Sequence, residues 1–193
     1  MSGLTFRLST YPDERLDLSP LTPSRLATTP LAEMLRIVVG TTKRQLKVGD
    51  VFAVSGQPGD TVTIQGGSEH LDFVGAGLDR GTLILDGDAG AYAGRKMTGG
   101  ELHLRGRAGA WLGSGLSGGL VTVKGSAGDH VGSTCHGDRF GMTGGIVVVE
   151  GNIGARVGEK MRRGTIIARG TAGTNAGSRM VGGTIWAEKG FAR

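Results

Sequence analysis

Four side chains of the types that bind transition metals lie close together between residues 130 and 138. They are His130, Cys135, His136 and Asp138. Imidazole, thiolate and carboxylate groups are common ligands of zinc and related metals, but this spacing matches no known metal-binding motif. We therefore predict no metal site. We interpret the segment as a protruding loop that makes interface contacts through Asp138, Arg139 and Phe140.

Residues 113–118 match the G-x-G-x-x-G pattern of dinucleotide-binding loops. That pattern binds a pyrophosphate only where it connects a strand to a helix of about a dozen residues. Here a short strand follows at 120–123, so we interpret the match as coincidental. Carboxylates are scattered, and Asp86 and Glu150 are too far apart in the expected fold to share a proton. We predict no catalytic residue and no cofactor bound by this chain.

Basic residues gather beside a column of methionines. They are Arg95, Lys96, Lys160, Arg162, Arg163 and Arg179. Arg105, Lys124 and Arg169 form a second outward group. Stacked at a regular spacing, such residues make ridges of positive charge. Two interpretations stay open: a solvated face that discourages the association of strand edges, or a docking site for an acidic subunit or a polyanionic cofactor.

These residues belong to a glycine repeat. One glycine recurs at positions 81, 100, 119, 145, 164 and 183. The spacing is 19 residues except once, where a 7-residue insertion falls within 133–141. Four-residue apolar or β-branched segments lie between the glycines, at 82–85, 120–123, 146–149 and 165–168. Segments of this length and composition are typical of strands and are too short for helices.

A period of 19 residues is too short for a strand, a crossover helix and a return strand. Successive parallel strands must therefore coil around an axis. We predict an all-β fold, a right-handed single-stranded parallel β-helix of about six to seven coils. Alternation along each strand predicts inward columns, the first of which is Leu83, Leu102, Val121, Val147, Ile166 and Ile185.

The N-terminal part lacks the repeat. Leu4, Phe6 and Leu8 alternate like an edge strand, Thr29 and Pro30 predict the start of a helix, and 46–54 reads as one or two strands. That helix is expected to bury one face, made of Leu31, Met34, Leu35 and Val38. We predict a small α+β cap in residues 1–58 and the β-helix in residues 59–193.

Outward-facing apolar residues require a cover. Ile84, Val148, Ile167 and Trp186 are expected on the outer side of the strands, where a hydrophobic stripe marks an interface. Either the N-terminal segment or another subunit is expected to cover them. The last coil, from residue 183, is incomplete, which predicts that a partner surface near Trp186 covers its open end.

Composition narrows the function classes. The 38 glycines come with only 5 prolines, which excludes collagen and disordered Pro/Gly tracts. A single cysteine excludes an internal disulfide framework and fits a reducing cytosol. Since neither a signal peptide nor a membrane span is evident, we predict a cytoplasmic protein without membrane contact. The net charge of +5 permits nucleic-acid binding, but two tryptophans and two tyrosines offer few stacking platforms, so we predict none.

The repeat unit at 81–100 resembles the glycine-rich coil of the C-terminal domain of the glutamate synthase large chain, a β-helix with a structural role. A closer resemblance is to the C subunit of formylmethanofuran dehydrogenase and of the bacterial formyltransferase/hydrolase complex. It rests on Leu-Lys-Val-Gly-Asp-Val-Phe at 46–52, Val-Gly-Ala-Gly at 74–77 and the insertion with its flank at 137–145. This likeness covers nearly the whole chain.

The resemblance implies one-carbon metabolism. It implies a non-catalytic structural C subunit of the formyltransferase/hydrolase complex, which moves a formyl group from tetrahydromethanopterin to a methanofuran-type carrier and releases formate. The partners it implies are formyltransferase, metal-dependent hydrolase and B-type subunits, which hold the metals and the substrates. Two alternatives stay open: the C subunit of molybdenum or tungsten formylmethanofuran dehydrogenase, and a basic docking module for a polyglutamyl cofactor or an acidic partner.

Overall fold

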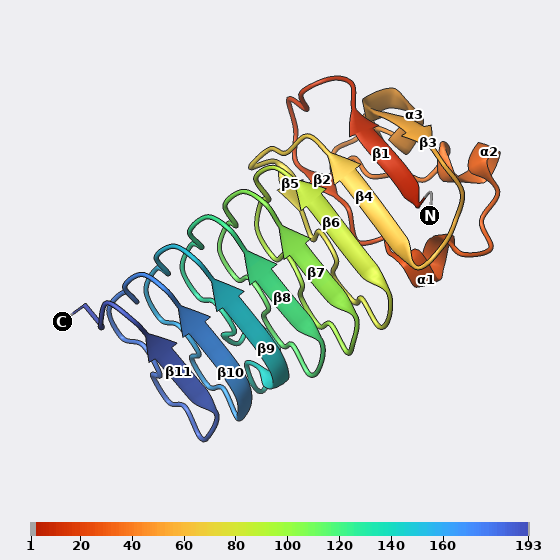
Figure 1. Ribbon diagram of the computed structural model, residues 1–193. Coiled ribbons are helices and arrows are strands. Elements are labelled where there is room, and N and C mark those ends of the chain that lie inside the picture. Colours follow the sequence, from red (N-terminus) through yellow and green to blue (C-terminus); the bar gives the residue numbers. More distant parts are fainter. Residues whose placement is uncertain (1–2, 193) are drawn as a thin grey trace.

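The computed structural model describes residues 3–192 of the chain. The fold is β-rich, with a nine-stranded mixed sheet and a separate two-stranded sheet. Figure 1 shows the strands of the large sheet side by side, with the N-terminal segment at one end of the stack. Met1, Ser2 and Arg193, the outermost residues of the two predicted segments, lie outside the described residues.

The strands are short. Their bounds are β1 Leu4–Leu8, β2 Leu16–Asp17, β3 Phe52–Ser55, β4 Thr61–Gln65, β5 Leu71–Asp72, β6 Thr82–Asp86, β7 Glu101–Leu104, β8 Leu120–Val123, β9 Thr143–Val149, β10 Arg163–Ala168 and β11 Thr184–Ala187. The helices are α1 Pro23–Leu26, α2 Leu31–Met34 and α3 Val48–Val51, each of 4 residues.

Strands β4 and β6 to β11 pair in parallel and in repeat register. Leu83 pairs with Leu102, and the column continues through Val121, Val147, Ile166 and Ile185. All but the last of these side chains are fully buried. This confirms the first predicted inward column and follows from the alternation of side chains along a strand.

A second wall of each coil pairs with the next coil as well. Isolated parallel bridges connect Ala89, Ala108, Ala127, Ile153, Ala172 and Phe191 in succession. On a third wall, the backbone N–H of Gly113 donates to the carbonyl of Ala93, and that of Gly132 to Leu112. Small residues such as Ala108 let these walls approach one another, so the core is narrow and continuous along the stack.

Side-chain oxygens at one corner add to the contact between coils. The Asp88, Asp129 and Asn152 side chains accept hydrogen bonds from the backbone N–H of Arg107, Ala155 and Thr171, at 2.7, 2.7 and 2.9 Å. Asp72 does the same for Ala91, at 2.7 Å, and also binds Arg15 of the N-terminal segment. These bonds satisfy donors that would otherwise face solvent at a turn.

The N-terminal segment differs from the sequence prediction in three places. First, β1 is not an edge strand, because it pairs antiparallel with β3 and in parallel with β4. Second, residues 48–51 form helix α3 rather than a strand. The Asp50 carboxylate accepts the Lys47 backbone N–H at 2.8 Å, which favours a helical turn over an extended chain.

The third difference concerns the helix after Pro30. Helix α2 ends after one turn, and of its predicted apolar face only Met34 is buried, whereas Leu31 and Val38 are exposed. The chain leaves the helix because the backbone N–H groups of Val39 and Gly40 both donate to the carbonyl of Leu46. Tertiary pairing therefore overrides the helical periodicity here. No helix within residues 3–192 is long and apolar enough to cross a membrane.

Candidate interaction surfaces

The structure divides the predicted basic ridge into two groups. In the first group, Arg95 Nη2 lies 3.1 Å from Asp138 Oδ2, and Lys96 Nζ lies 2.9 Å from Asp138 Oδ1. The Lys96 ammonium, with a further contribution from Arg95, holds the pKa of the Asp138 carboxyl below its ordinary value. The insertion is thereby tied to a coil two turns nearer the N-terminus.

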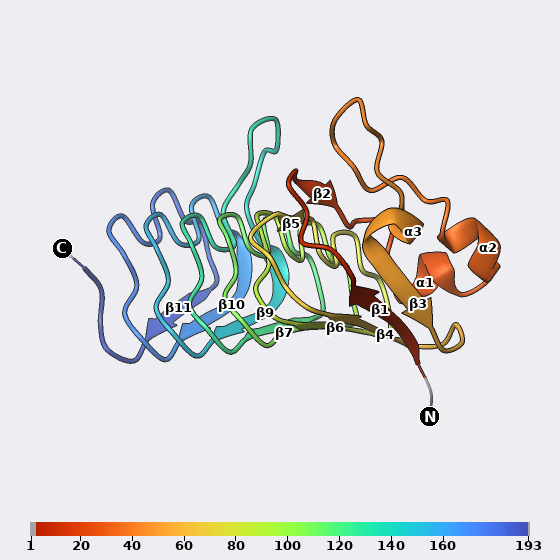
Figure 2. The same ribbon diagram turned by 90° about the horizontal axis from the view of Figure 1, so that it is seen from above.

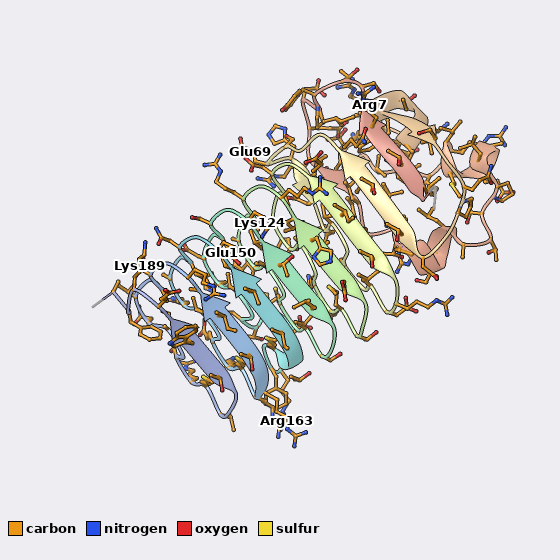
Figure 3. All side chains as sticks on the ribbon, viewed as in Figure 1. Arg7, Glu69, Lys124, Glu150, Arg163 and Lys189 are labelled. Carbon is orange, nitrogen blue, oxygen red and sulfur yellow. The ribbon has the colours of Figure 1, made fainter. Side chains whose placement is uncertain are left out.

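The second group is free of such pairing. No carboxylate within residues 3–192 forms an ion pair with any of Lys160, Arg162, Arg163 and Arg179, or with Arg139 of the insertion. The guanidinium groups of Arg139 and Arg162 lie over the Phe140 ring, at 5.0 and 4.4 Å from the ring centroid. Figure 3 shows Arg163 where strand β10 begins, away from Lys124 and Glu150 at the opposite ends of the strands.

Hydrogen bonds hold the base of the insertion. The Thr134 hydroxyl donates to the carbonyl of Asp138 at 2.9 Å, and buried Cys135 lies with its Sγ 2.9 Å from Ser114 Oγ. The Ser133 hydroxyl accepts the backbone N–H of Glu159 at 3.1 Å. Figure 2 shows a loop of this part of the chain projecting beyond the neighbouring coils.

The four predicted metal-ligand types do not converge. Cys135 is buried at the base of the insertion, His136 is exposed, and Asp138 is occupied by Arg95 and Lys96. Within residues 3–192, no three His, Cys, Asp or Glu side chains are arranged to hold a metal ion.

The two carboxylates compared in the sequence lie in ion pairs at the outer rim of the sheet. Asp86 lies 3.7 Å from Arg105, and Glu150 lies 3.8 Å from Arg169. Both carboxylates are about half exposed, so such pairs contribute little to stability. The rim therefore resembles a solvated face, in which acidic and basic residues are interspersed along the stack.

A stack of aromatic rings, which was not predicted from the sequence, crosses four coils. Phe73 and Tyr92 are 4.8 Å apart between ring centroids, Tyr92 and Trp111 5.3 Å, and Trp111 and His130 4.9 Å, and the stacked rings are nearly parallel. Each of the four residues has a positive φ between 57° and 64°. Their 19-residue spacing in the sequence is the signal that would have revealed the stack.

The stack ends at a polar pocket beside the insertion. The pocket has a volume of about 460 Å³, and its lining includes Trp111, His130, His136, Glu159 and Lys160. His130 Nδ1 is buried without a hydrogen-bond partner in the described residues and lies 3.8 Å from Glu159 Oε2. A hollow with an aromatic wall and charges of both signs is suited to receive a side chain of another protein.

The outer face of the large sheet becomes more apolar along the stack, although the half-buried Ile84 lies beside His103 in its N-terminal half. In its N-terminal half, His103 contacts Thr122 at 2.7 Å and Glu101 at 2.9 Å. In its C-terminal half, Ile146 is 44% exposed and Trp186 is 49% exposed. The N-terminal segment does not cover this face, because β1 and β3 extend the sheet at its end (Figures 1 and 2). Of the two covers expected for the apolar column, the N-terminal segment is therefore excluded, and another subunit stays a prediction.

The chain resembles known proteins in sequence and in structure. No protein-family model matches it. A segment of 86 residues, 45% of this chain, is 42% identical to the C subunit of the formyltransferase/hydrolase complex of Methylorubrum extorquens. That segment spans 32% of the relative's length. The fold matches a chain in the crystal structure of the formyltransferase/hydrolase complex of the same organism in complex with methylofuran, with a TM-score of 0.91 and 40% identity. This match covers 94% of the present chain and 68% of that chain.

The fold and its surfaces define a class of protein: a glycine-repeat chain of stacked coils whose distinctive surface features are suited to contacts with other chains. Within that class, the sequence match and the structural match both name the formyltransferase/hydrolase complex. The chain belongs to the family of the C subunit of the formyltransferase/hydrolase complex.

Proposed function

We propose that this chain is a non-catalytic structural subunit of a formyltransferase/hydrolase complex, built as a right-handed parallel β-helix. The observation that carries the proposal is the structural match over 94% of the chain, at 40% identity, to a chain of that complex. The repeat register of the parallel strands and the second ladder of bridges support the β-helical description. The proposed division is a cap at residues 1–58 and the coils from residue 59 onward.

The surfaces support a role in assembly. The uncovered apolar half of the outer sheet face, with Ile146 and Trp186, has the character of an interface. The insertion that carries Asp138, Arg139 and Phe140 is the one interruption of the repeat and projects beyond the coils. Projecting loops on a rigid scaffold commonly carry specific contacts.

In the proposed complex, a formyl group passes from tetrahydromethanopterin to a methanofuran-type carrier and is released as formate. The relative's structure contains methylofuran, which supports a carrier of this type. The proposed partners are formyltransferase, metal-dependent hydrolase and B-type subunits, which supply the metals and substrate sites. Both comparisons name the formyltransferase/hydrolase complex, which favours it over the dehydrogenase. A cytoplasmic location stays a prediction, as does the alternative of a basic docking module for a polyglutamyl carrier.

The test is recovery of the intact complex. The chain is expressed with an affinity tag in its native host, purified gently, and weighed by native mass spectrometry. We expect formyltransferase and hydrolase subunits in fixed ratio, and an assembly that releases formate from formyl-tetrahydromethanopterin. Recovery of the tagged chain as a free monomer, with the other subunits assembled without it, would contradict the proposal.

A pair of variants tests the outer face. Ile146→Asp places a charge in the apolar half, whereas Thr82→Asp places the same charge at the equivalent strand position of the polar half, beside Glu101. We expect Ile146→Asp to reduce recovery of partner subunits and Thr82→Asp to leave it unchanged. Equal recovery with both variants would show that partners do not use the apolar half.

A further inference from the structure

One corner adopts a left-handed backbone conformation in five of the coils, where its residue is either glycine or a basic residue. Gly77 and Gly115 have φ values of 70° and 67° at this corner. Lys96, Lys160 and Arg179 occupy the same corner in other coils, with φ values of 54°, 55° and 54°. Glycine adopts this conformation freely, whereas residues with a Cβ adopt it at a cost in free energy. Three coils therefore retain a long basic side chain where the backbone favours glycine.

The three basic corner residues differ in their partners. Lys96 contacts Asp138, an acidic residue on a projecting loop, at 2.9 Å. Lys160 and Arg179 have no carboxylate partner among residues 3–192. In the one coil where the basic corner residue has a partner, that partner is a carboxylate on a loop that projects beyond the coils.

The unpaired corner is part of a compact patch. Arg162 and Arg163 follow Lys160 and are exposed, and Arg139 and Phe140 reach the same place from the insertion. The half-buried Phe140 ring, in contact with Arg139 and Arg162, adds an aromatic group to the cations. Aromatic and arginine side chains are the types most enriched at the centres of protein interfaces.

We propose that Arg139, Phe140, Lys160, Arg162, Arg163 and Arg179, here called the basic corner, dock an acidic segment of another subunit of the complex. The proposal rests on the proposed function, since it names the surface through which this subunit binds a partner. Charge complementarity identifies the occupant, because five neighbouring cations without an internal partner match an anionic surface on another chain. The contact of Asp138 with Arg95 and Lys96 is the internal equivalent of that docking.

The arrangement favours a protein segment over a long soluble polyanion. An extended polycarboxylate chain needs a continuous positive track along the stack. Asp138 neutralises the corner at Arg95 and Lys96, and Gly115 occupies the corner of the coil between them and the insertion. The five cations Arg139, Lys160, Arg162, Arg163 and Arg179 lie on the insertion and on the coils around β10, beside an aromatic ring, which fits one acidic protein segment.

The left-handed corner provides a test that does not damage the fold. The double variant Lys160→Gly, Arg179→Gly removes two charges and gives the backbone the residue that it favours. We expect the melting temperature to stay within about 3 °C of the wild type. In the co-expressed complex we expect the affinity for the partner subunit to fall about tenfold and its dependence on salt to weaken.

Two matched controls separate charge from backbone effects. Lys96→Gly makes the same substitution at the same corner, where Asp138 retains Arg95 as a partner. Lys124→Ala removes one exposed charge from the opposite ends of the strands. We expect both controls to assemble like the wild type. Zero-length coupling of amines to carboxylates, read by mass spectrometry, should connect Lys160 to an acidic peptide of a partner subunit.

The outcomes are distinct. If the wild type assembles and the double glycine variant assembles equally well, the basic corner is not the docking surface, whereas the proposed function stands. If the wild type recovers no partner, the proposed function fails first. If a poly-γ-glutamate peptide binds the wild-type complex and not the variant, while both assemble equally, the corner holds a soluble polyanion and the proposal is overturned.

Discussion

The core of the N-terminal segment and the core of the coils are built on different principles. In the cap, Phe6 and Phe52 meet edge to face with ring centroids 6.2 Å apart, and both are buried. In the coils, buried positions recur once per coil with small or aliphatic residues, such as Leu102, Val121 and Val147. Stability in the coils is spread over many equivalent contacts, whereas stability in the cap depends on a few large side chains.

The most severe single change is therefore expected in the cap. Phe6→Ala removes a fully buried ring that packs against Phe52 and leaves a cavity. We expect the free energy of unfolding to fall by about 3–5 kcal/mol, as measured by denaturant unfolding. Tyr11→Ala is the control, because Tyr11 is 76% exposed in the same segment, and its effect should stay within about 0.5 kcal/mol. Equal losses would mean that the cap does not depend on its buried rings.

The coils are expected to be sensitive to close approach rather than to the loss of volume. A methyl group at Gly144 would meet the carbonyl oxygen of Ser117 on the preceding coil. We expect Gly144→Ala to lower the free energy of unfolding by about 1–3 kcal/mol through overpacking, read by thermal and denaturant unfolding. At Gly59, in an exposed loop beside the cap, no atom lies within 4 Å of an added methyl. Gly59→Ala should therefore be neutral or slightly stabilising; a loss at Gly59 as large as at Gly144 would argue against steric crowding between coils.

The contrast between the coils and the cap also explains which parts of the fold can be predicted from the sequence. In the coils, the period and the alternation at Leu83 and its equivalents determine which side chains face inward, and the register confirms that column. In the cap, the conformation depends on contacts between distant residues, such as Val39 with Leu46, that no local pattern encodes. Helix α3, where strands were expected, and the single turn of α2 both follow from such contacts.

The candidate surfaces also differ in how far the sequence predicts them. The basic residues and the insertion are evident from the sequence, because they repeat or interrupt the period. The neutralisation of Arg95 and Lys96 by Asp138 is not, because it joins residues two coils apart across a loop of irregular conformation. The stack of Phe73, Tyr92, Trp111 and His130 has a periodic signal. That signal falls at a corner position outside the strands, where the alternation of apolar residues gives no guidance.

The boundary between the two regions provides a third prediction. The Asp72 carboxylate accepts two hydrogen bonds, one from the Arg15 guanidinium of the cap and one from the backbone N–H of Ala91 in the first regular coil. Both are 2.7 Å long. Asp72→Ala leaves both donors without this acceptor. We expect a loss of about 1–3 kcal/mol and faster hydrogen exchange at Ala91 in particular.

The matched control for Asp72 is an exposed pair of similar length within the cap. Arg44 lies 2.8 Å from Asp13, and its guanidinium lowers the pKa of the Asp13 carboxyl. Asp13→Ala should leave the melting temperature unchanged, since solvent screens this pair. If the two variants behaved alike, Asp72 would contribute only an exposed ion pair and no connection between cap and coils.

The smallest expected effect concerns the loop that interrupts the repeat. Lys96 and Arg95 lower the pKa of Asp138 in the folded chain. The stabilisation that the Asp138 carboxylate gives to the folded insertion is therefore present in full above the ordinary carboxyl pKa of 3.8. That stabilisation is lost as the pH falls through the lower, folded-state pKa. Asp138→Asn should remove it at all pH values and speed hydrogen exchange in the insertion about two- to fivefold at neutral pH. The global melting temperature should not change.

His136→Gln is the control for that loop, because His136 is exposed in the same insertion. It should leave exchange in the insertion unaltered. If the amide hydrogens of the insertion exchange as slowly in Asp138→Asn as in the wild type, the hydrogen bonds of Ser133 and Thr134 alone hold the loop. The corner at Lys96 would then be as available to an outside carboxylate as the corner at Lys160, and the distinction between the two basic groups would disappear.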